Sequence, residues 1–260
     1  VGRSTELATL RDVFTEARES GAAHLATVIG APGVGKTRLA AELCAGTTSR
    51  SFDLRFERRG STTFTPIADL LRDLTGTGTV GDVERLVTGH PEAARLAGVL
   101  CSLLGHGETR STEESFWAVR RLLEFLAADD PLTVVVDDIQ WAEPLFWDLL
   151  DHLVEWADAP VLLLALARPE LRELRPDLAQ VGRRVSAAIA LEGLDAAATR
   201  ELAARLLDAD ELPDELIERL PDSTEGNPLF VRELVHMLVD DGVVERAGDR
   251  WQLTIDADAI

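Results

Sequence analysis

Apolar positions recur along the chain with two periods, and the period changes from one segment to the next. In residues 4–18 the apolar side chains are spaced by three and four, which places them on one face of a helix. The run HLATVIG at 24–30 is short and partly β-branched and predicts a strand. The next segment, KTRLAAELC at 36–44, returns to the helical period. The first 44 residues therefore predict a helix, a strand and a second helix.

The same alternation of strands and helices continues to about residue 193. Strands are predicted at 52–57, 131–138, 161–167 and 186–191. Helices are predicted in the glycine-broken region 65–107, at 113–128 and at 144–156. The run PLTVVVDD shows no alternation of apolar and polar residues, which is typical of a central parallel strand buried on both faces.

The alternation ends near Gly193. Three helical segments follow at 195–207, 213–220 and 227–241, and GVVERAGDRWQL predicts a β-hairpin with its turn at Gly248-Asp249. We therefore divide the chain into a nucleotide-binding core at 1–193, a helical lid at 194–240 and the truncated start of a further domain at 241–260.

Composition narrows the class of protein. The chain has 260 residues, 46% of them hydrophobic, and lacks an apolar run long enough to span a membrane, so we predict a soluble, cytoplasmic protein. A formal charge of −20 opposes binding to nucleic acid, and the short pairs Arg58-Arg59 and Arg183-Arg184 are interpreted as solvated surface. The sequence begins at Val1 without methionine or a signal-peptide pattern, and we interpret it as a piece of a longer chain.

The segment VIGAPGVGKT carries the clearest chemistry. Gly30, four residues, then Gly35, Lys36 and Thr37 follow a predicted strand and open a predicted helix, which is the context of a phosphate-binding loop. Glycine permits backbone conformations that let N–H groups approach phosphate oxygens, and the helix N-terminus adds partial positive charge. Lys36 is expected to bridge the β- and γ-phosphates, and the Thr37 hydroxyl to bind Mg²⁺.

Two aspartates at the end of a buried strand form the expected second half of this site. In VVVDD, Asp137 is the predicted Mg²⁺ ligand, and Asp138 is placed to orient or deprotonate the attacking water. The alternative is a polar strand end followed by a capped loop.

Two further residues are candidates with structural alternatives. Arg168 ends the strand VLLLALA and could sense a γ-phosphate, or it could be a surface arginine at a helix start. In EGNPLF, Asn227 fits a helix cap and Pro228 fits the first helical turn, which is sufficient to explain the segment without a ligand.

The segments VGR, GAPGVGKT, DDIQWAEP, ARPE and GNPLFVRELV occur in the order and spacing of a known family. The chain resembles the STAND class of AAA+-related signalling ATPases. It looks most like the ATPase domain of large bacterial transcriptional regulators of the LuxR or MalT type and of similar antibiotic-pathway activators. This resemblance covers essentially the whole chain, and DDIQWAEP combined with GNPLF is more specific than the phosphate loop, which many NTPases share.

The resemblance implies an α/β fold: a P-loop NTPase parallel sheet with flanking helices, then a helical lid domain and the start of a winged-helix-like segment. It implies ATP or ADP with Mg²⁺ held by Thr37 and Asp137, and catalytic roles for Asp138, Lys36 and Arg168. The nucleotide-binding residues that it implies are Val1, Gly2, Arg3, Gly30, Ala31, Pro32, Gly33, Val34, Gly35, Lys36, Thr37, Arg38 and Pro228.

The function expected on this basis is an ATP/ADP-controlled switch in a transcriptional regulator, reset by slow ATP hydrolysis. DNA would be bound only through domains outside this segment, and nucleotide-dependent self-association stays open because no arginine that reaches a neighbouring subunit's site is identified. The alternative is a remodelling or initiator ATPase in which turnover is the output. A small-molecule kinase is disfavoured because no acceptor site is recognisable.

Overall fold

The computed structural model describes residues 1–58, 60, 62–182, 185–209, 220, 223–247 and 250–254. Except for its last residue, the helix predicted at 213–220 lies outside these ranges, as do the predicted turn at Gly248-Asp249 and the residues Arg59, Arg183 and Arg184. Contacts within the chain divide it into two compact units. The larger unit contains residues 6–29 and 37–189, and the smaller unit contains residues 1–5, 30–36 and 190–260.

A five-stranded sheet forms the centre of the larger unit, as the sequence predicts. Its strands are β1 (Ala23–Gly30), β2 (Arg50–Arg55), β3 (Leu132–Asp137), β4 (Val161–Ala167) and β5 (Ala187–Leu191). They lie in the order β2-β3-β4-β1-β5, and the pairs β2–β3, β3–β4 and β4–β1 are parallel. The predicted α/β fold class with a parallel sheet is confirmed. Because the strands run in parallel, the carboxyl ends of β1, β3 and β4 meet at one edge of the sheet.

The strand order places β4 between β1 and β3, although β2 separates β1 from β3 in the sequence. The run of seven buried residues in β4 fits this central position, since both of its faces are covered. Alternate residues of β3 and β4 join a core cluster on one face, while Val135, Leu162 and Leu164 between them are equally buried on the other.

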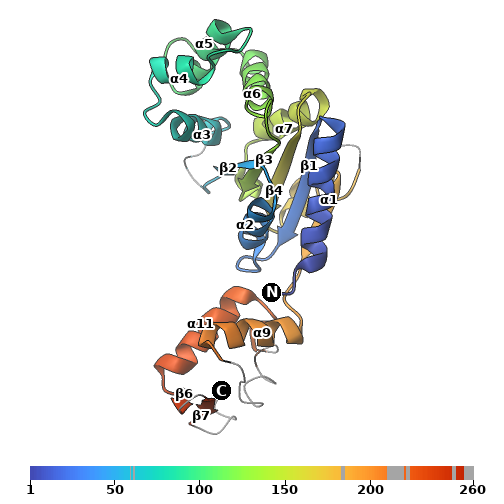
Figure 1. The fold of residues 1–260 in the computed structure, drawn as a ribbon, viewed down its shortest axis with the longest axis vertical. Coiled ribbons are helices and arrows are strands. Elements are labelled where there is room, and N and C mark those ends of the chain that lie inside the picture. Colours follow the sequence, from blue (N-terminus) through green and yellow to red (C-terminus); the bar gives the residue numbers. More distant parts are fainter. Residues whose placement is uncertain are drawn as a thin grey trace. The chain divides into compact units, whose positions relative to one another are not determined.

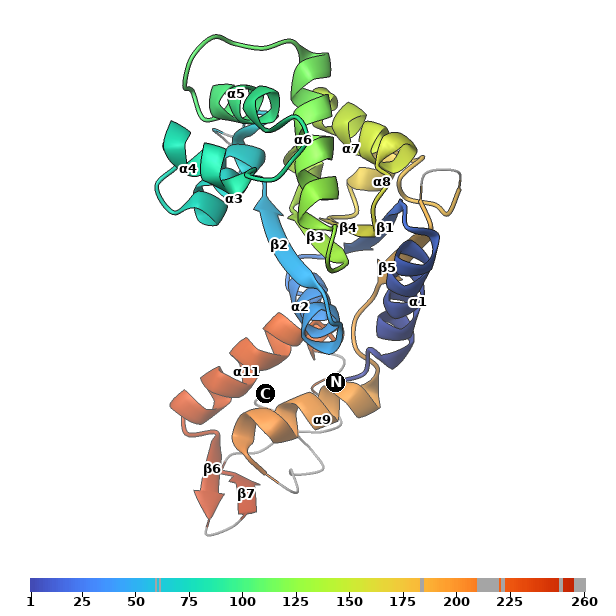
Figure 2. The same ribbon diagram turned by 45° about the horizontal axis from the view of Figure 1, so that its top comes forward.

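Helices cover the larger unit on both sides of the sheet (Figures 1 and 2). The first two helices are α1 (Ser4–Ser20) and α2 (Lys36–Gly46). Two short elements, the 3₁₀ turn η1 (Ile139–Trp141) and α8 (Leu171–Leu174), follow β3 and β4. The others are α3 (Thr65–Thr75), α4 (Val80–Leu86), α5 (Ala93–Leu103), α6 (Thr112–Leu126) and α7 (Pro144–Trp156). The glycine-broken region 65–107 thus becomes three helices, which lie beside α6 in both views.

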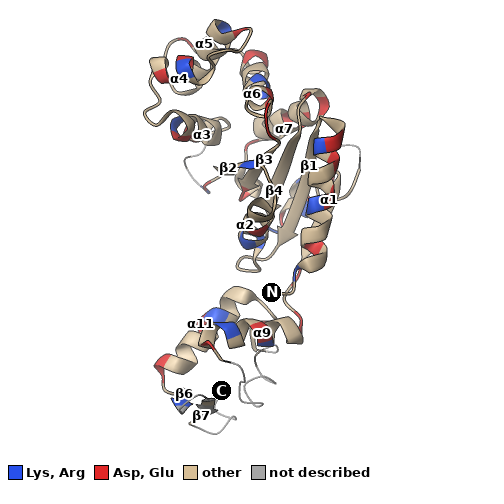
Figure 3. Cartoon of the chain, viewed as in Figure 1, with Lys and Arg blue, Asp and Glu red and all other residues tan. Residues whose placement is uncertain are grey.

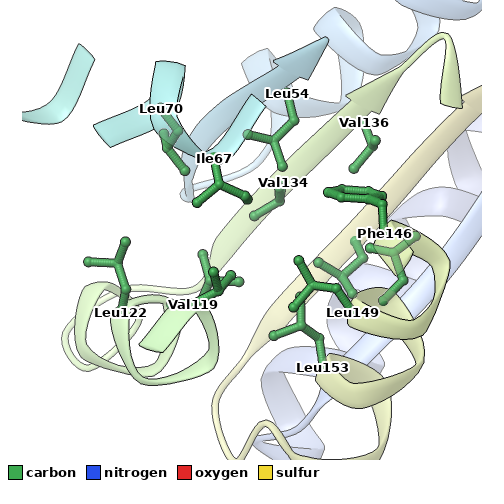
Figure 4. A pocket seen from close by; sticks show the side chains of 13 residues that line it. Leu54, Ile67, Leu70, Val119, Leu122, Val134, Val136, Phe146, Leu149 and Leu153 are labelled. Atoms are coloured by element: carbon green, nitrogen blue, oxygen red, sulfur yellow. The ribbon is translucent and has the colours of Figure 1, made fainter. Parts of the chain in front are cut away.

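The face of the sheet toward α3, α6 and α7 is a dry core rather than a binding site (Figure 4). Phe146 of α7 and Leu149 point into it from one side, and Leu54 and Val134 from the strands. The remaining cavity measures about 10 Å³ and is lined only by apolar side chains. A space of this size and polarity holds no ligand, because it offers neither room nor hydrogen-bond partners.

The smaller unit is built on two helices, α9 (Ala196–Leu207) and α11 (Pro228–Asp240), and an antiparallel pair, β6 (Val244–Ala247) and β7 (Arg250–Leu253). The buried side chains of these elements form their own apolar cluster, which includes Ala203, Leu207, Val231, Val235 and Val244. The indole N–H of Trp251 donates to the Leu207 carbonyl at 3.1 Å and ties the hairpin to α9. Both strands of the predicted hairpin are therefore confirmed.

Charged side chains lie mainly on the helices, and β1 and β4 carry none (Figure 3). β3 has a single charged residue, Asp137, at its last position. Apart from Asp137, the charged residues that make up the net charge of −20 therefore lie outside the buried strands, where an unpaired ion would be costly. None of the helices in the described part of the chain combines the length and apolar content needed to cross a bilayer.

Candidate functional site

The loop between β1 and α2 contains three glycines that the structure requires for different reasons. Gly33 and Gly35 have φ values of +78° and +106°, a region that residues with a Cβ atom rarely adopt. A Cβ atom at Gly30 would lie 2.5 Å from the carbonyl oxygen of Leu191. These glycines therefore let the loop bend sharply, as a phosphate-binding loop must.

Lys36, the only lysine of the chain, begins α2 and folds back over this loop. Its Nζ donates to the carbonyl oxygens of Gly30 at 2.8 Å and Ala31 at 3.1 Å, and the residue is only 9% exposed. Arg38, two residues later, points to solvent and pairs with Glu42 at 3.5 Å. The ammonium group thus lies against the loop, whereas the guanidinium group of Arg38 lies on the outer surface of α2.

Of the first three residues, Arg3 contacts the loop within the smaller unit. Arg3 Nη2 donates to the carbonyl oxygen of Val34 at 3.3 Å and to that of Glu192 at 2.5 Å. Gly2 has a φ of +64°, and a Cβ atom there would lie 2.6 Å from Cβ of Ala198. Val1 is exposed. Arg3 therefore joins the phosphate loop to the segment between β5 and α9.

Asp137, the last residue of β3, binds the first turn of α2. Its Oδ2 accepts a hydrogen bond from the Thr37 hydroxyl at 3.0 Å, and its Oδ1 accepts one from the backbone N–H of Asp138 at 2.9 Å. A hydroxyl and a carboxylate oxygen are the hard ligands that Mg²⁺ prefers, and Mg²⁺ commonly takes only one or two carboxylates together with phosphate oxygens. The pair of side chains predicted from the sequence to hold Mg²⁺ therefore lies together and fits the ion.

Asp138 adopts a left-handed backbone conformation, with φ 54° and ψ 37°. Aspartate and asparagine tolerate this region better than most residues, and the conformation turns the chain from β3 into η1. The carboxylate oxygen Oδ1 accepts from Gln140 Nε2 at 2.8 Å and lies 3.6 Å from Arg168 Nε. Two residues predicted separately, Asp138 and Arg168, thus form an ion pair at the ends of neighbouring strands.

Gln140 is a site residue that the sequence did not reveal. It is buried, donates from Nε2 to Asp138, and accepts at Oε1 from the backbone N–H of Arg168 at 3.1 Å. A carboxylate can only accept and a backbone N–H can only donate, so these partners fix the orientation of the amide. One side chain therefore holds the ends of β3 and β4 together. The only available signal was a polar residue in the otherwise apolar stretch Ile139–Trp141.

Two arginines approach the Trp141 ring from different segments. The guanidinium carbon of Arg58 lies 5.6 Å from its ring centroid and that of Arg168 lies 5.7 Å away, distances typical of cation–π contacts. Arg58 is exposed, as predicted, but its contact with Trp141 was not foreseen.

The loop after β2 is also fixed by Glu143, whose Oε2 accepts from the Thr63 backbone N–H at 2.8 Å and from its hydroxyl at 2.5 Å.

The cysteine of α2 has no reactive character. Burial raises the pKa of the Cys44 thiol above its ordinary value, so near neutral pH the group stays protonated and weakly nucleophilic.

Pro228 is the first residue of α11 and is half-buried, and Asn227 before it caps the helix by accepting from Leu229 N–H at 3.1 Å. Asn227 also contacts the phosphate loop, through Nδ2 and the carbonyl oxygen of Pro32 at 2.9 Å. The role that the resemblance implies for Pro228 stays a prediction, and the hydrogen bond from this segment to the loop comes from Asn227.

Comparison with known proteins agrees with this geometry. The family described as AAA ATPase domain matches residues 1–164. A second family, described as a domain of unknown function (DUF8739), matches residues 195–251. An uncharacterized protein of Rhizobium meliloti (strain 1021) is 33% identical over 138 residues, which cover 47% of this chain and 12% of that protein. The chain therefore corresponds to a small part of this curated relative.

Solved structures share the fold at low sequence identity. A Walker-type ATPase of Pyrococcus abyssi matches 92% of this chain and 68% of its own, with a TM-score of 0.54 and 16% identity. A signal transduction ATPase with numerous domains (STAND) from Pyrococcus horikoshii, which has a tetratricopeptide repeat sensor, matches 92% of this chain and 32% of its own, with a TM-score of 0.52 and 19% identity. A katanin chain gives a TM-score of 0.52 at 16% identity, over 93% of this chain and 69% of its own.

We expect Gln140→Met to destabilise the larger unit, because a side chain of similar length leaves the Arg168 N–H without its acceptor. The free energy of unfolding should fall by about 1–3 kcal/mol, the cost of a buried polar group without a partner. Urea denaturation followed by tryptophan fluorescence measures this change, since four of the five tryptophans lie in residues 117–156.

The matched control is Gln180→Met, at an exposed position of the same unit. It should change stability by less than about 0.5 kcal/mol. Equal stability losses in the two variants would show that Gln140 does not bridge the strand ends.

Proposed function

The chain belongs to the AAA ATPase domain family, and on that premise we propose that it is an ATP/ADP-binding switch of the STAND type within a transcriptional regulator. ATP and ADP would favour different arrangements of the lid and the core. Slow Mg²⁺-dependent hydrolysis would return the protein from the first state to the second. The observation that carries the proposal is the phosphate loop, whose glycines, lysine and helix start all have the geometry that an anionic phosphate needs.

Binding of the phosphates would use the loop backbone and Lys36. The Lys36 ammonium group now bonds two loop carbonyl oxygens, and a phosphate is a stronger acceptor that carries a full opposite charge. Thr37 and Asp137 would hold Mg²⁺, which would neutralise charge on the β- and γ-phosphate oxygens. Val1, Gly2, Arg3 and Pro228 are proposed for the adenine end on the basis of the family resemblance alone.

Hydrolysis would depend on Asp138. A water oxygen attacks the γ-phosphorus, the bond from that phosphorus to the β–γ bridging oxygen breaks, and the water proton passes to the Asp138 carboxylate. The products are ADP and inorganic phosphate. In this structure the same carboxylate accepts a hydrogen bond from Gln140 and pairs with Arg168.

A switch also requires that the lid detect the nucleotide. Residues 30–36 of the phosphate loop belong to the same compact unit as residues 190–260, so a ligand on the loop would act directly on the lid. From the sequence we propose the divisions 1–193, 194–240 and 241–260 as core, lid and the start of a winged-helix-like domain, whereas the contacts group residues 1–5 and 30–36 with 190–260. ATP and ADP share the base, so any preference between states must arise at the γ-phosphate.

The regulatory context is proposed from the resemblance and from charge. A segment with a formal charge of −20 repels the DNA backbone, so DNA contact would belong to other parts of the protein. The chain spans 12% of its Rhizobium relative and 32% of the Pyrococcus STAND chain, which fits one domain within a larger regulator.

We expect Lys36→Ala to lose ATP binding, because no other lysine exists to neutralise the β- and γ-phosphates. The loss should be about 2–5 kcal/mol, the cost of removing one partner from a buried charged hydrogen bond. Isothermal titration calorimetry measures it, and Lys36→Arg, which keeps the charge, serves as the comparison. Near wild-type affinity in Lys36→Ala would contradict the phosphate-loop assignment.

We expect Asp138→Asn to bind ATP and Mg²⁺ normally and to hydrolyse ATP about 10²–10⁴-fold more slowly, because an amide does not accept the proton. Asparagine tolerates the left-handed backbone at this position, so the loop should keep its shape. Asp137→Asn should instead weaken Mg²⁺-dependent binding. Steady-state phosphate release and Mg²⁺ titrations separate the two effects, and the reverse pattern would refute this division of roles.

We expect Arg168→Ala to leave ADP affinity nearly unchanged and to remove most of the structural difference between the ATP and ADP states. Paired spin labels, one in each unit, would measure the label-to-label distance with ATP bound and with ADP bound. Arg172→Ala, an exposed arginine on α8, is the matched control and should behave as the wild type. A variant lacking Arg168 that still changes shape normally would place the γ-phosphate sensor elsewhere.

A further inference from the structure

Three consecutive carbonyl groups of the phosphate loop accept hydrogen bonds from outside the loop. The carbonyl oxygen of Pro32 accepts from Asn227 Nδ2 at 2.9 Å, and that of Gly33 accepts from Leu229 N–H at 3.3 Å. The carbonyl oxygen of Val34 accepts from Arg3 Nη2 at 3.3 Å. All three donors belong to the smaller unit, and two of them lie at the N-terminus of α11.

These contacts also orient the loop's donors. In a trans peptide group the C=O of one residue and the N–H of the next point in opposite directions, and the described chain contains no cis peptide. Holding the Pro32 carbonyl therefore fixes the direction of the Gly33 N–H. The next two contacts do the same for the N–H groups of Val34 and Gly35. The Val34 N–H donates to the Ala31 carbonyl oxygen within the loop at 3.3 Å. The N–H groups of Gly33 and Gly35 precede Lys36 and belong to the concave run that can surround a phosphate.

The approach of α11 to the loop is close enough to require glycine. A Cβ atom at Gly33 would lie 2.6 Å from Cβ of Leu229 and 2.9 Å from Oδ1 of Asn227. Asn227 itself is only 8% exposed, and its backbone N–H donates to the Thr224 carbonyl oxygen at 2.9 Å. The backbone of Asn227 is thus fixed by Thr224, while its side chain donates to the loop.

Asparagine is used nowhere else in this chain. Elsewhere the side chains that cap described helices are Thr79, Ser111 and Asp195, each of which accepts a backbone N–H. Serine and aspartate cap a helix about as well as asparagine does. Capping therefore does not explain the residue at 227. A serine hydroxyl is too short to reach the loop in the same way, and an aspartate has no N–H to donate.

We propose that Asn227 is a positioning residue for phosphate, which orients the loop N–H groups toward the phosphates of a nucleoside di- or triphosphate. This role rests on the proposed nucleotide-binding function. Since a coupling free energy is reciprocal, phosphate on the loop also strengthens the contact between the loop and α11. Asn227 thereby links phosphate occupancy to the position of the lid helix, separately from any contact of Pro228 with the base.

Asn227→Ser tests this proposal, because serine keeps the helix cap and loses the bond to Pro32. Calorimetry should show a decrease of about three- to tenfold in affinity for ADP and for inorganic pyrophosphate, the net worth of one hydrogen bond. Adenosine affinity and the urea unfolding midpoint should stay at wild-type values. Asn227→Asp should lose at least as much affinity, since its charge faces a carbonyl oxygen.

Asp195→Ser is the matched control, a cap exchange in the same unit at the start of α9, and should leave ADP and pyrophosphate affinity unchanged. Unchanged ADP affinity in Asn227→Ser, or equal losses for adenosine and ADP, would overturn the positioning role while leaving the proposed function intact. A wild-type protein that binds neither ADP nor pyrophosphate would instead refute the proposed function, and the role of Asn227 with it.

Discussion

Parallel pairing of β1, β4 and β3 is the constraint on which the larger unit depends. These strands are fully or nearly fully buried, and apart from Asp137 they have no charged side chain. They can therefore pair side by side without leaving an ion in the core. Because all three run in one direction, their carboxyl ends bring Asp137, Asp138 and Arg168 to one edge of the sheet. Chemistry can develop at that edge without weakening the core beneath it.

A small polar network stabilises this edge. Gln140 connects the Asp138 carboxylate to the backbone at the end of β4, and Arg168 approaches the same carboxylate as a cation. Thr37 links Asp137 to the first turn of α2. Each group in the network has a partner of the right kind, so the cost of partial burial is offset and the side chains are held in one geometry. That rigidity is what a site for a charged ligand needs, since little reorganisation remains when the ligand arrives.

The phosphate loop combines bends that glycine permits with support from other segments. Its glycines make the bend accessible, but glycine also leaves the loop with many alternative conformations. The bonds from Asn227, the Leu229 N–H and Arg3 reduce that freedom by fixing successive carbonyl groups. The residues that shape the loop therefore come from the smaller unit, and the loop's donor geometry depends on the position of α11. This dependence is the physical basis for the proposed link between phosphate binding and α11.

The sequence alone determined the features that depend on near neighbours. Hydrophobic spacing identified most strands and helices, because burial of one face imposes a period on the residues themselves. The glycines, lysine and threonine of the phosphate loop were recognisable for a similar reason, since backbone conformation and charge act within eight consecutive residues. The positions of Asp137 and Arg168 at strand ends followed from where the apolar runs stop.

Only the tertiary structure decided which distant residues meet. The sequence did not show that β4 lies between β1 and β3, because strand order leaves no periodic signal along the chain. It did not show that Gln140 bonds a backbone group 28 residues away, or that Asn227 bonds Pro32 across 195 residues. Its role as a helix cap explained Asn227 from the sequence alone, so nothing in the sequence indicated its second hydrogen bond, to the Pro32 carbonyl oxygen. Contacts of this kind depend on the packing of whole elements, and no short stretch of sequence contains that information.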